Sequence, residues 1–187
     1  YPMGAAMFLA NGGENIRFKC RKFVGVSDSV NAEPEYLVLD GQQRLTTLML
    51  LLRAFYSSFE AAVDQPSKDM RAMLEKCIWK TDELDRPQFS ELKIDSEVAT
   101  DNEKDEFLSI LKSGNAFNKK TKYAINFNFF VEKINTFLQE YPSYFSYLPN
   151  RILNNCILLP IEAESQDTAL RIFSTLNDRG RPLADSD

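Results

Sequence analysis

The fold of this chain is decided by residues 37–48, which read LVLDGQQRLTTL. The apolar residues before Asp40 predict the end of a strand, Asp-Gly predicts a turn, and the apolar residues after Arg44 predict a helix. The helix therefore begins beside a glycine, two amides and a guanidinium. Because a helix N-terminus is electropositive and an Arg fork matches phosphate geometry, this junction is suited to hold a phosphate.

Each residue of this junction can also be explained by a purely structural role, without a ligand. Asp40 can hold a metal ion, but Asp is equally common as a helix N-cap. Glycine lets a ligand approach the backbone closely, but it also simply turns the chain. Arg44 can contact phosphate through two parallel hydrogen bonds, or it can be an ordinary surface charge. The candidate ligand contacts are Gly41, Gln42, Gln43, Arg44 and Thr46.

The composition is that of a globular domain with a moderate acidic excess. The chain has 187 residues, of which 44% are hydrophobic, and a net charge of −5. This charge argues against a protein that binds nucleic acid over its whole surface. Two short basic runs, residues 17–22 and 119–122, are either local binding patches or solvated faces, and solvated faces are the commoner case.

The absence of histidine excludes several kinds of catalytic site. Within this chain there is no Ser-His-Asp triad, no Cys-His dyad, no His-ligated zinc and no HNH-type nuclease centre. The cysteines, Cys20, Cys77 and Cys156, show no zinc or disulfide spacing, which predicts reduced thiols in a cytoplasmic protein. No apolar run is long enough to predict a membrane span, and the start of the chain is unlike a signal peptide.

The periodicity along the chain predicts an α+β domain. Strands are expected over about 4–39 and 156–162, with residues 5–10 and 16–26 forming a hairpin. A mainly helical insertion is expected over about 64–154. The expected helices cover residues 43–63, 67–78 with Ser67 as the N-cap, 102–112, 123–141, and a last one capped by Ser165.

A second motif follows that last helix, at residues 173–183, which read FSTLNDRGRPL. Asn177 and Gly180 can form a tight left-handed turn, and Arg179 places a guanidinium beside it. Taken alone, this pattern is best explained as a helix C-terminus, where cations are favoured by the helix dipole.

Together, the two motifs resemble those of the GmrSD-type family, the N-terminal domain of modification-dependent (type IV) restriction enzymes and related phage-defence proteins. The strong likeness lies in residues 37–48 and 172–187, and weaker likeness lies in 1–10 and 123–134. Members of the family usually carry a Tyr-Gln-Arg segment upstream and a helix after the second motif. We therefore expect residues 1–187 to be one domain, taken from a longer protein.

The resemblance implies a fold similar to the ParB and sulfiredoxin group, a small mixed sheet with a helical insertion subdomain. It implies a nucleoside triphosphate ligand with Mg²⁺, bound and hydrolysed by this domain. Asp40, as a ligand of the metal or of its bound water, and Arg44, as a phosphate contact, are then the expected catalytic residues. Asn177, Arg179 and Gly180 are expected to form the facing wall of the nucleotide pocket.

The expected partners are the nucleotide, DNA bound through the full-length protein, and a C-terminal nuclease domain or subunit with an HNH-like centre. No membrane partner is expected. Because the chain offers no clear general base besides Asp40, a non-catalytic module that senses a nucleotide or a DNA backbone is the alternative. A scaffold with a degenerate site is a third possibility, which the intact run from Asp40 to Arg44 disfavours.

Overall fold

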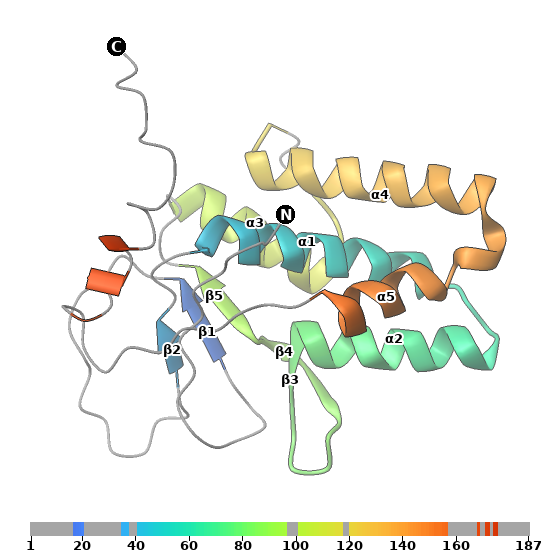
Figure 1. Ribbon diagram of the computed structural model, residues 1–187, viewed down its shortest axis with the longest axis horizontal. Helices are drawn as coiled ribbons and strands as arrows, with labels where there is room; N and C mark the ends of the chain where they lie inside the picture. The colour runs from blue at the N-terminus through green and yellow to red at the C-terminus, as the bar shows by residue number, and fades with distance from the viewer. Residues whose placement is uncertain are drawn as a thin grey trace.

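The computed structural model describes residues 17–20, 35–37, 41–96, 101–117 and 120–156, together with Thr168, Arg171, Ile172, Ser174 and Thr175 (Figure 1). The backbone alone is described for 17–20, 35–37, 95–96 and 101–103. Helices dominate, with a three-stranded sheet and a separate two-stranded sheet beside them. This arrangement is compatible with the predicted α+β class.

The larger sheet is formed by three short strands that are distant in sequence. It contains β1 (Arg17–Cys20), β2 (Glu35–Leu37) and β5 (Ile94–Ser96) in the order β2-β1-β5. Both pairings are parallel, and Phe18 of the central strand lies in register with Tyr36 on one side and Ile94 on the other. A parallel sheet of this kind directs the carboxyl ends of all its strands to one edge.

For residues 17–20, the predicted hairpin with residues 5–10 is wrong. A strand has two edges, and both edges of β1 are occupied, one by β2 and the other by β5. A third strand therefore has no place beside Phe18 and Lys19. Residues 5–10 lie outside the described residues, as do residues 157–162, where another strand is predicted.

The second sheet is an antiparallel hairpin of β3 (Trp79–Thr81) and β4 (Pro87–Leu92), which the sequence did not predict. Asp82 organises its turn, because its Oδ1 accepts hydrogen bonds from the backbone N–H groups of Leu84 and Arg86, both at 2.9 Å. Only Lys93 separates β4 from β5. The stretch over 64–154 is thus mainly helical, but it contributes one strand to the larger sheet.

The long helices agree with the predicted ones to within a few residues. They are α1 (Gln42–Phe59), α2 (Gln65–Ile78), α3 (Asp101–Ser113) and α4 (Lys122–Glu140). A 3-10 turn (Pro142–Tyr144) and α5 (Tyr147–Asn155) follow, and neither was predicted. The helical positions described between 168 and 175 agree with the helix predicted after Ser165.

The N-cap of α2 is Asp64, and the prediction of Ser67 is wrong. Asp64 Oδ1 accepts a hydrogen bond from the Ser67 backbone N–H at 3.0 Å, which places Ser67 inside the first turn. Pro66 explains the shift. Proline is favoured in the first helical turn, where its missing N–H costs nothing, so the cap must precede it.

Helix α1 lies at the centre of the helical layer, where it contacts α2, α3 and α4 (Figure 1). Among its large apolar side chains, those of Phe55, Phe59 and Leu50 are each at most 2% exposed. Burial of such side chains stabilises the fold by about 1.5–3 kcal/mol each. The helix that begins at the Gly41 junction is therefore also the helix on which the other long helices of the described chain pack.

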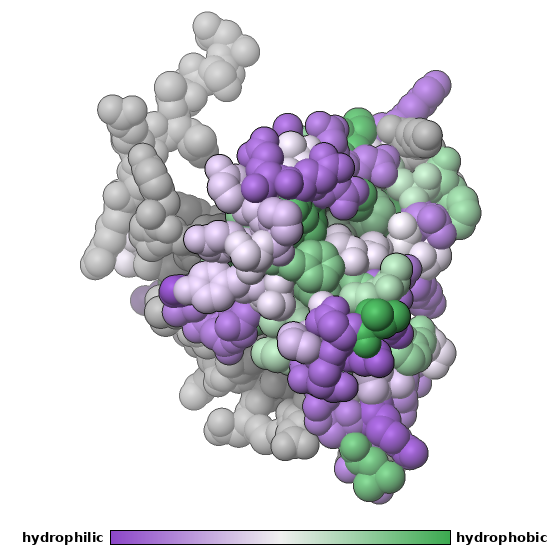
Figure 2. All heavy atoms as spheres, turned by 90° about the vertical axis from the view of Figure 1, so that its right-hand side faces the viewer, coloured by the Kyte–Doolittle hydropathy of each residue, from purple (hydrophilic) through white to green (hydrophobic). Residues whose placement is uncertain are grey.

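The face shown in Figure 2 carries pale and green side chains between strongly hydrophilic areas above and below them. It includes the end of the helical layer where the 3-10 turn joins α4 to α5. None of the helices among the described residues combines the length and hydrophobicity that crossing a bilayer requires.

Candidate functional site

The N-terminus of α1 is formed by Gly41, which is the N-cap residue. Gly41 has φ 82° and ψ 8°, a left-handed conformation that glycine adopts without a steric penalty. Its carbonyl accepts the first helical hydrogen bond, from the Leu45 N–H at 2.8 Å. The N-cap of this helix is therefore Gly41 and not Asp40.

The junction lies at the carboxyl edge of the parallel sheet. Only residues 38–40 separate the end of β2 from Gly41, and the four Cα–Cα steps from Leu37 to Gly41 span about 14 Å at most. In open sheets with parallel strands, ligands bind at the carboxyl ends of the strands, where helix N-termini converge. The motif thus occupies the position in the sheet where such a site is expected.

The first turn of α1 itself adds no negative charge to the start of the helix. It contains no acidic residue, so no carboxylate of its own neutralises the electropositive end of the helix. Gln43 and Arg44 are exposed and Gln42 is half-buried. The guanidinium of Arg44 and the amide of Gln43 are accordingly accessible to a ligand from solvent.

Thr46 has a structural role at this junction. Its side chain is buried, and its hydroxyl donates to the backbone carbonyls of Gln42 and Gln43, both at 3.0 Å. Thr47 donates to the Gln43 carbonyl in the same manner, at 2.6 Å. These contacts direct both hydroxyl groups back along the helix, and a contact of Thr46 with the ligand stays a prediction.

The remaining predicted site residues, Asp40, Asn177, Arg179 and Gly180, lie outside the described residues. The structure therefore brings Gly41, Gln42, Gln43 and Arg44 together on one helical turn. The pairing of this turn with the Asn177–Gly180 turn stays a prediction.

Among the described side chains, no three or more Cys, Asp and Glu residues form a cluster that could hold a metal ion. Cys77 is not a candidate nucleophile, because burial raises the pKa of its thiol and so disfavours the reactive thiolate. The chemistry that the described part of the site offers is thus the binding of an anion by N–H groups, amides and a guanidinium.

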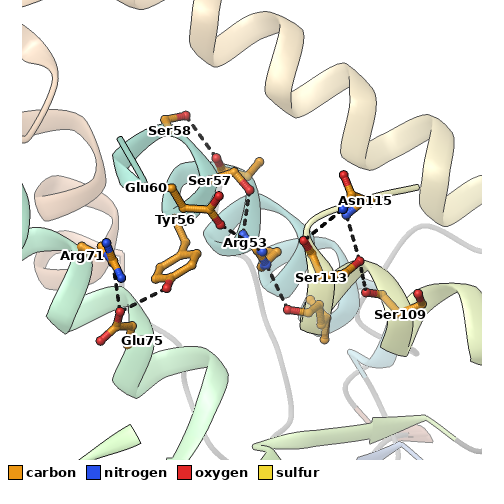
Figure 3. Close-up of polar contacts among 12 residues, drawn as sticks. Arg53, Tyr56, Ser57, Ser58, Glu60, Arg71, Glu75, Ser109, Ser113 and Asn115 are labelled. Carbon is orange, nitrogen blue, oxygen red and sulfur yellow. Dashed lines mark hydrogen bonds and ion pairs between the residues drawn. The ribbon is translucent and has the colours of Figure 1, made fainter. Parts of the chain in front are cut away.

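One charged residue of α1 was missed by sequence reasoning. Arg53 is only 2% exposed, and its Nε donates to the Leu111 carbonyl of α3 at 2.9 Å. It also donates from Nη1 to Ser57 Oγ of α1 at 2.6 Å and from Nη2 to Glu60, the C-cap residue of α1, at 3.3 Å, as Figure 3 shows. Burial lowers the pKa of this guanidinium, and the Glu60 carboxylate partly opposes that effect.

Arg53 thus fixes the helix that carries the motif. Its guanidinium lies over the Tyr56 ring, 4.8 Å from the ring centre, and ties α1 to the end of α3. The available signal was a charged residue among the apolar positions of a helix, which indicates a buried and fully bonded group. We assign it a structural role.

With the geometry of the junction established, the comparison with known families identifies the chain. The family described as GmrSD restriction endonuclease, N-terminal domain, matches residues 1–187, which is the whole chain. The chain belongs to this family. No curated protein and no solved structure matches it. Membership in the GmrSD family supports a role in DNA restriction or defence, and it connects the chain with a nuclease that acts on DNA.

Proposed function

We propose that this GmrSD N-terminal domain binds a nucleoside triphosphate with Mg²⁺ at the N-terminus of α1, and hydrolyses it to regulate a modification-dependent DNA nuclease. One observation carries the proposal: an exposed Arg44 stands in an acid-free first turn that follows a left-handed glycine. The turn lies at the carboxyl edge of a parallel sheet.

The residues of the junction would have different roles in nucleotide binding. Backbone N–H groups of the first turn and the Arg44 guanidinium would neutralise phosphate charge, and the exposed Gln43 amide would orient the same group. Asp40 would position the metal or its bound water, and Asn177, Arg179 and Gly180 would close the pocket from the opposite side. Bound Mg²⁺ would supply charge neutralisation at the phosphates. Transfer of a phosphoryl group requires mainly positioning and charge stabilisation, so histidine is not needed.

The proposed nucleotide site agrees with the ParB and sulfiredoxin-like fold that the resemblance implies, in which a strand, a loop and a helix hold phosphate. DNA cleavage would belong to a separate C-terminal domain or subunit. We also propose that the full-length protein binds DNA, that the domain acts together with that nuclease, and that the protein is cytoplasmic. The absence of histidine from the chain supports this division, because an HNH centre requires it.

A non-catalytic sensing module is the second candidate. It is favoured by one observation: the described residues around Arg44 are glutamines and threonines, none of which is an effective general base. Release of inorganic phosphate by the full-length protein decides between the two. Hydrolysis that is lost in Asp40→Asn while nucleotide binding persists would support the enzyme, whereas binding without turnover in the unaltered protein would support the sensor.

A further inference from the structure

Helix α4 is an outer helix of the described fold. It packs on α1 and α3, and it lies along the margin of the helical layer in Figure 1. Its buried residues are Ala124, Phe127 and Ile134. Phe130 and Val131 are half-buried and pack against the same core. The exposed residues of the helix lie on its outer surface.

The outer face of α4 combines cations with an exposed aromatic ring. Lys122, Asn126, Phe129 and Lys133 follow one another at intervals of four, three and four residues, which places them in one row on a helix. All four are exposed, and Phe129 is 52% exposed. Lys133 Nζ lies 5.5 Å from the centre of the Phe129 ring. Ile125, 54% exposed, adjoins this row.

The stretch of sequence that leads into α4 and through most of it is basic, although the whole chain is acidic. Residues 107–131 contain four of the 22 basic residues and none of the 27 acidic ones. In the turn before α4, Lys120 and Phe117 are exposed. Glu132 is the nearest acid on α4, and its exposed ion pair with Lys133, at 3.7 Å, is of a kind that contributes little.

We propose that the outer face of α4, formed by Lys122, Ile125, Asn126, Phe129 and Lys133, binds a DNA strand. The lysines contact phosphates, and the Phe129 ring stacks on an unpaired base. Lysines that release counterions from phosphates and aromatic rings that stack on bases are the two features shared by surfaces that bind single strands. The row extends over about 16 Å of helix, which is long enough to meet several phosphates.

A solvated face and an apolar protein interface both fit this surface less well than a DNA strand does. A merely solvated face would not need an exposed Phe and an exposed Ile beside its lysines. An apolar protein interface would be depleted of lysine at its centre, whereas here lysines stand on both sides of the ring. The inference rests on the proposed function only in taking DNA as a ligand of the full-length protein.

The test is fluorescence anisotropy of the full-length protein with a labelled oligonucleotide, as a single strand and as a duplex. Lys122→Gln is compared with Lys68→Gln, which removes another exposed charge from the first turn of a helix. Phe129→Ala is compared with Leu84→Ala at the exposed tip of the hairpin.

We expect Lys122→Gln to weaken binding of the single strand roughly fivefold to tenfold at about 0.1 M salt, and to flatten its salt dependence by about one phosphate contact. Phe129→Ala should weaken it by about fivefold or more, which corresponds to the loss of one stacked base. Lys68→Gln and Leu84→Ala should leave the affinity unchanged.

Unaltered DNA affinity in both Lys122→Gln and Phe129→Ala would overturn the inference, as would a full-length protein that binds neither oligonucleotide. A change in oligomeric state with DNA affinity preserved would assign the face to a protein contact and would also overturn it. Nucleotide binding, measured in the same variants, should be unchanged. Failure of this surface is therefore distinguishable from failure of the nucleotide site at Arg44.

Discussion

The side chain of Arg53 on α1 fills the space in which a side chain on Gly114 would stand. A Cβ atom placed on Gly114 would lie 2.4 Å from Arg53 Nη2 and 2.7 Å from its Cζ. Gly114 also has φ +71°, and it follows directly after α3. The end of α3 and the middle of α1 are thus fitted to each other through one glycine and one buried cation.

Gly114→Ala should destabilise the protein. The guanidinium of Arg53 cannot simply move aside, because it is held by Leu111, Ser57 and Glu60. The left-handed backbone adds a steric penalty for alanine, so the expected loss is about 2–4 kcal/mol of unfolding free energy by urea titration. Asn115→Ala, in the exposed neighbouring position, should change it by less than about 0.5 kcal/mol. If Gly114→Ala is as stable as Asn115→Ala, the space between Gly114 and the Arg53 guanidinium can accept a Cβ atom, which would contradict this prediction.

Arg53→Met should reveal the coupling between the two residues. The substitution removes the guanidinium and leaves the Leu111 carbonyl without its donor, at an expected cost of about 1–3 kcal/mol. In this background Gly114→Ala should cost clearly less than in the unaltered protein, because only the backbone penalty is left. A double-mutant cycle with urea unfolding measures the difference, and additivity within about 0.5 kcal/mol would contradict the fit described here.

Asp64 should make the stability of α2 depend on pH in the acid range. Hydrogen bonds from Ser67 hold the pKa of the Asp64 carboxyl below its ordinary value of 3.8. A lowered folded-state pKa means that the stabilisation is present above the unfolded value, and is lost as the pH falls from about 4 through the folded value. Asp64→Asn keeps a good N-cap that does not titrate. The stability of the unaltered protein relative to Asp64→Asn should therefore fall on acidification, and an unchanged difference would refute the assignment.

Gly41 should be required for two separable reasons. Gly41→Ala strains a left-handed backbone and is expected to destabilise the protein by about 1–2 kcal/mol. Gly41→Asn should recover most of this stability, because Asn tolerates the left-handed region and is a good N-cap. If a ligand approaches the bare backbone here, Gly41→Asn should restore thermal stability without restoring nucleotide affinity. Full recovery of nucleotide affinity in Gly41→Asn would show that Gly41 is required only for the backbone conformation of the turn.

Much of this fold could be predicted because it is locally encoded. The apolar residues of α1, α3 and α4 recur at three and four residues, and the structure buries those faces. The hairpin of β3 and β4 was missed because four successive residues of β4 are exposed and show no apolar alternation. The pairing of β1 with β5 joins segments far apart in sequence, which no local pattern specifies.

The candidate site was predictable to a similar degree. The Asp-Gly-Gln-Gln-Arg run located the N-terminus of α1 correctly, because glycine and a following apolar row mark a helix start. The choice of Gly41 over Asp40 as the N-cap depends on the left-handed backbone conformation of Gly41. The amino-acid sequence does not specify that conformation. The buried position of Thr46 depends on packing with elements that the sequence does not place.

The central claim is tested most directly by isothermal titration calorimetry of nucleoside triphosphates with Mg²⁺ on full-length protein carrying Arg44→Ala. Loss of a charge-assisted contact to phosphate should weaken binding at least about tenfold, with Arg44→Lys falling between the two because it keeps the charge without the fork. Arg151→Ala, which removes an exposed arginine from α5, should bind as the unaltered protein does. Equal affinity of Arg44→Ala and the unaltered protein, at equal thermal stability, would contradict the phosphate site at the start of α1.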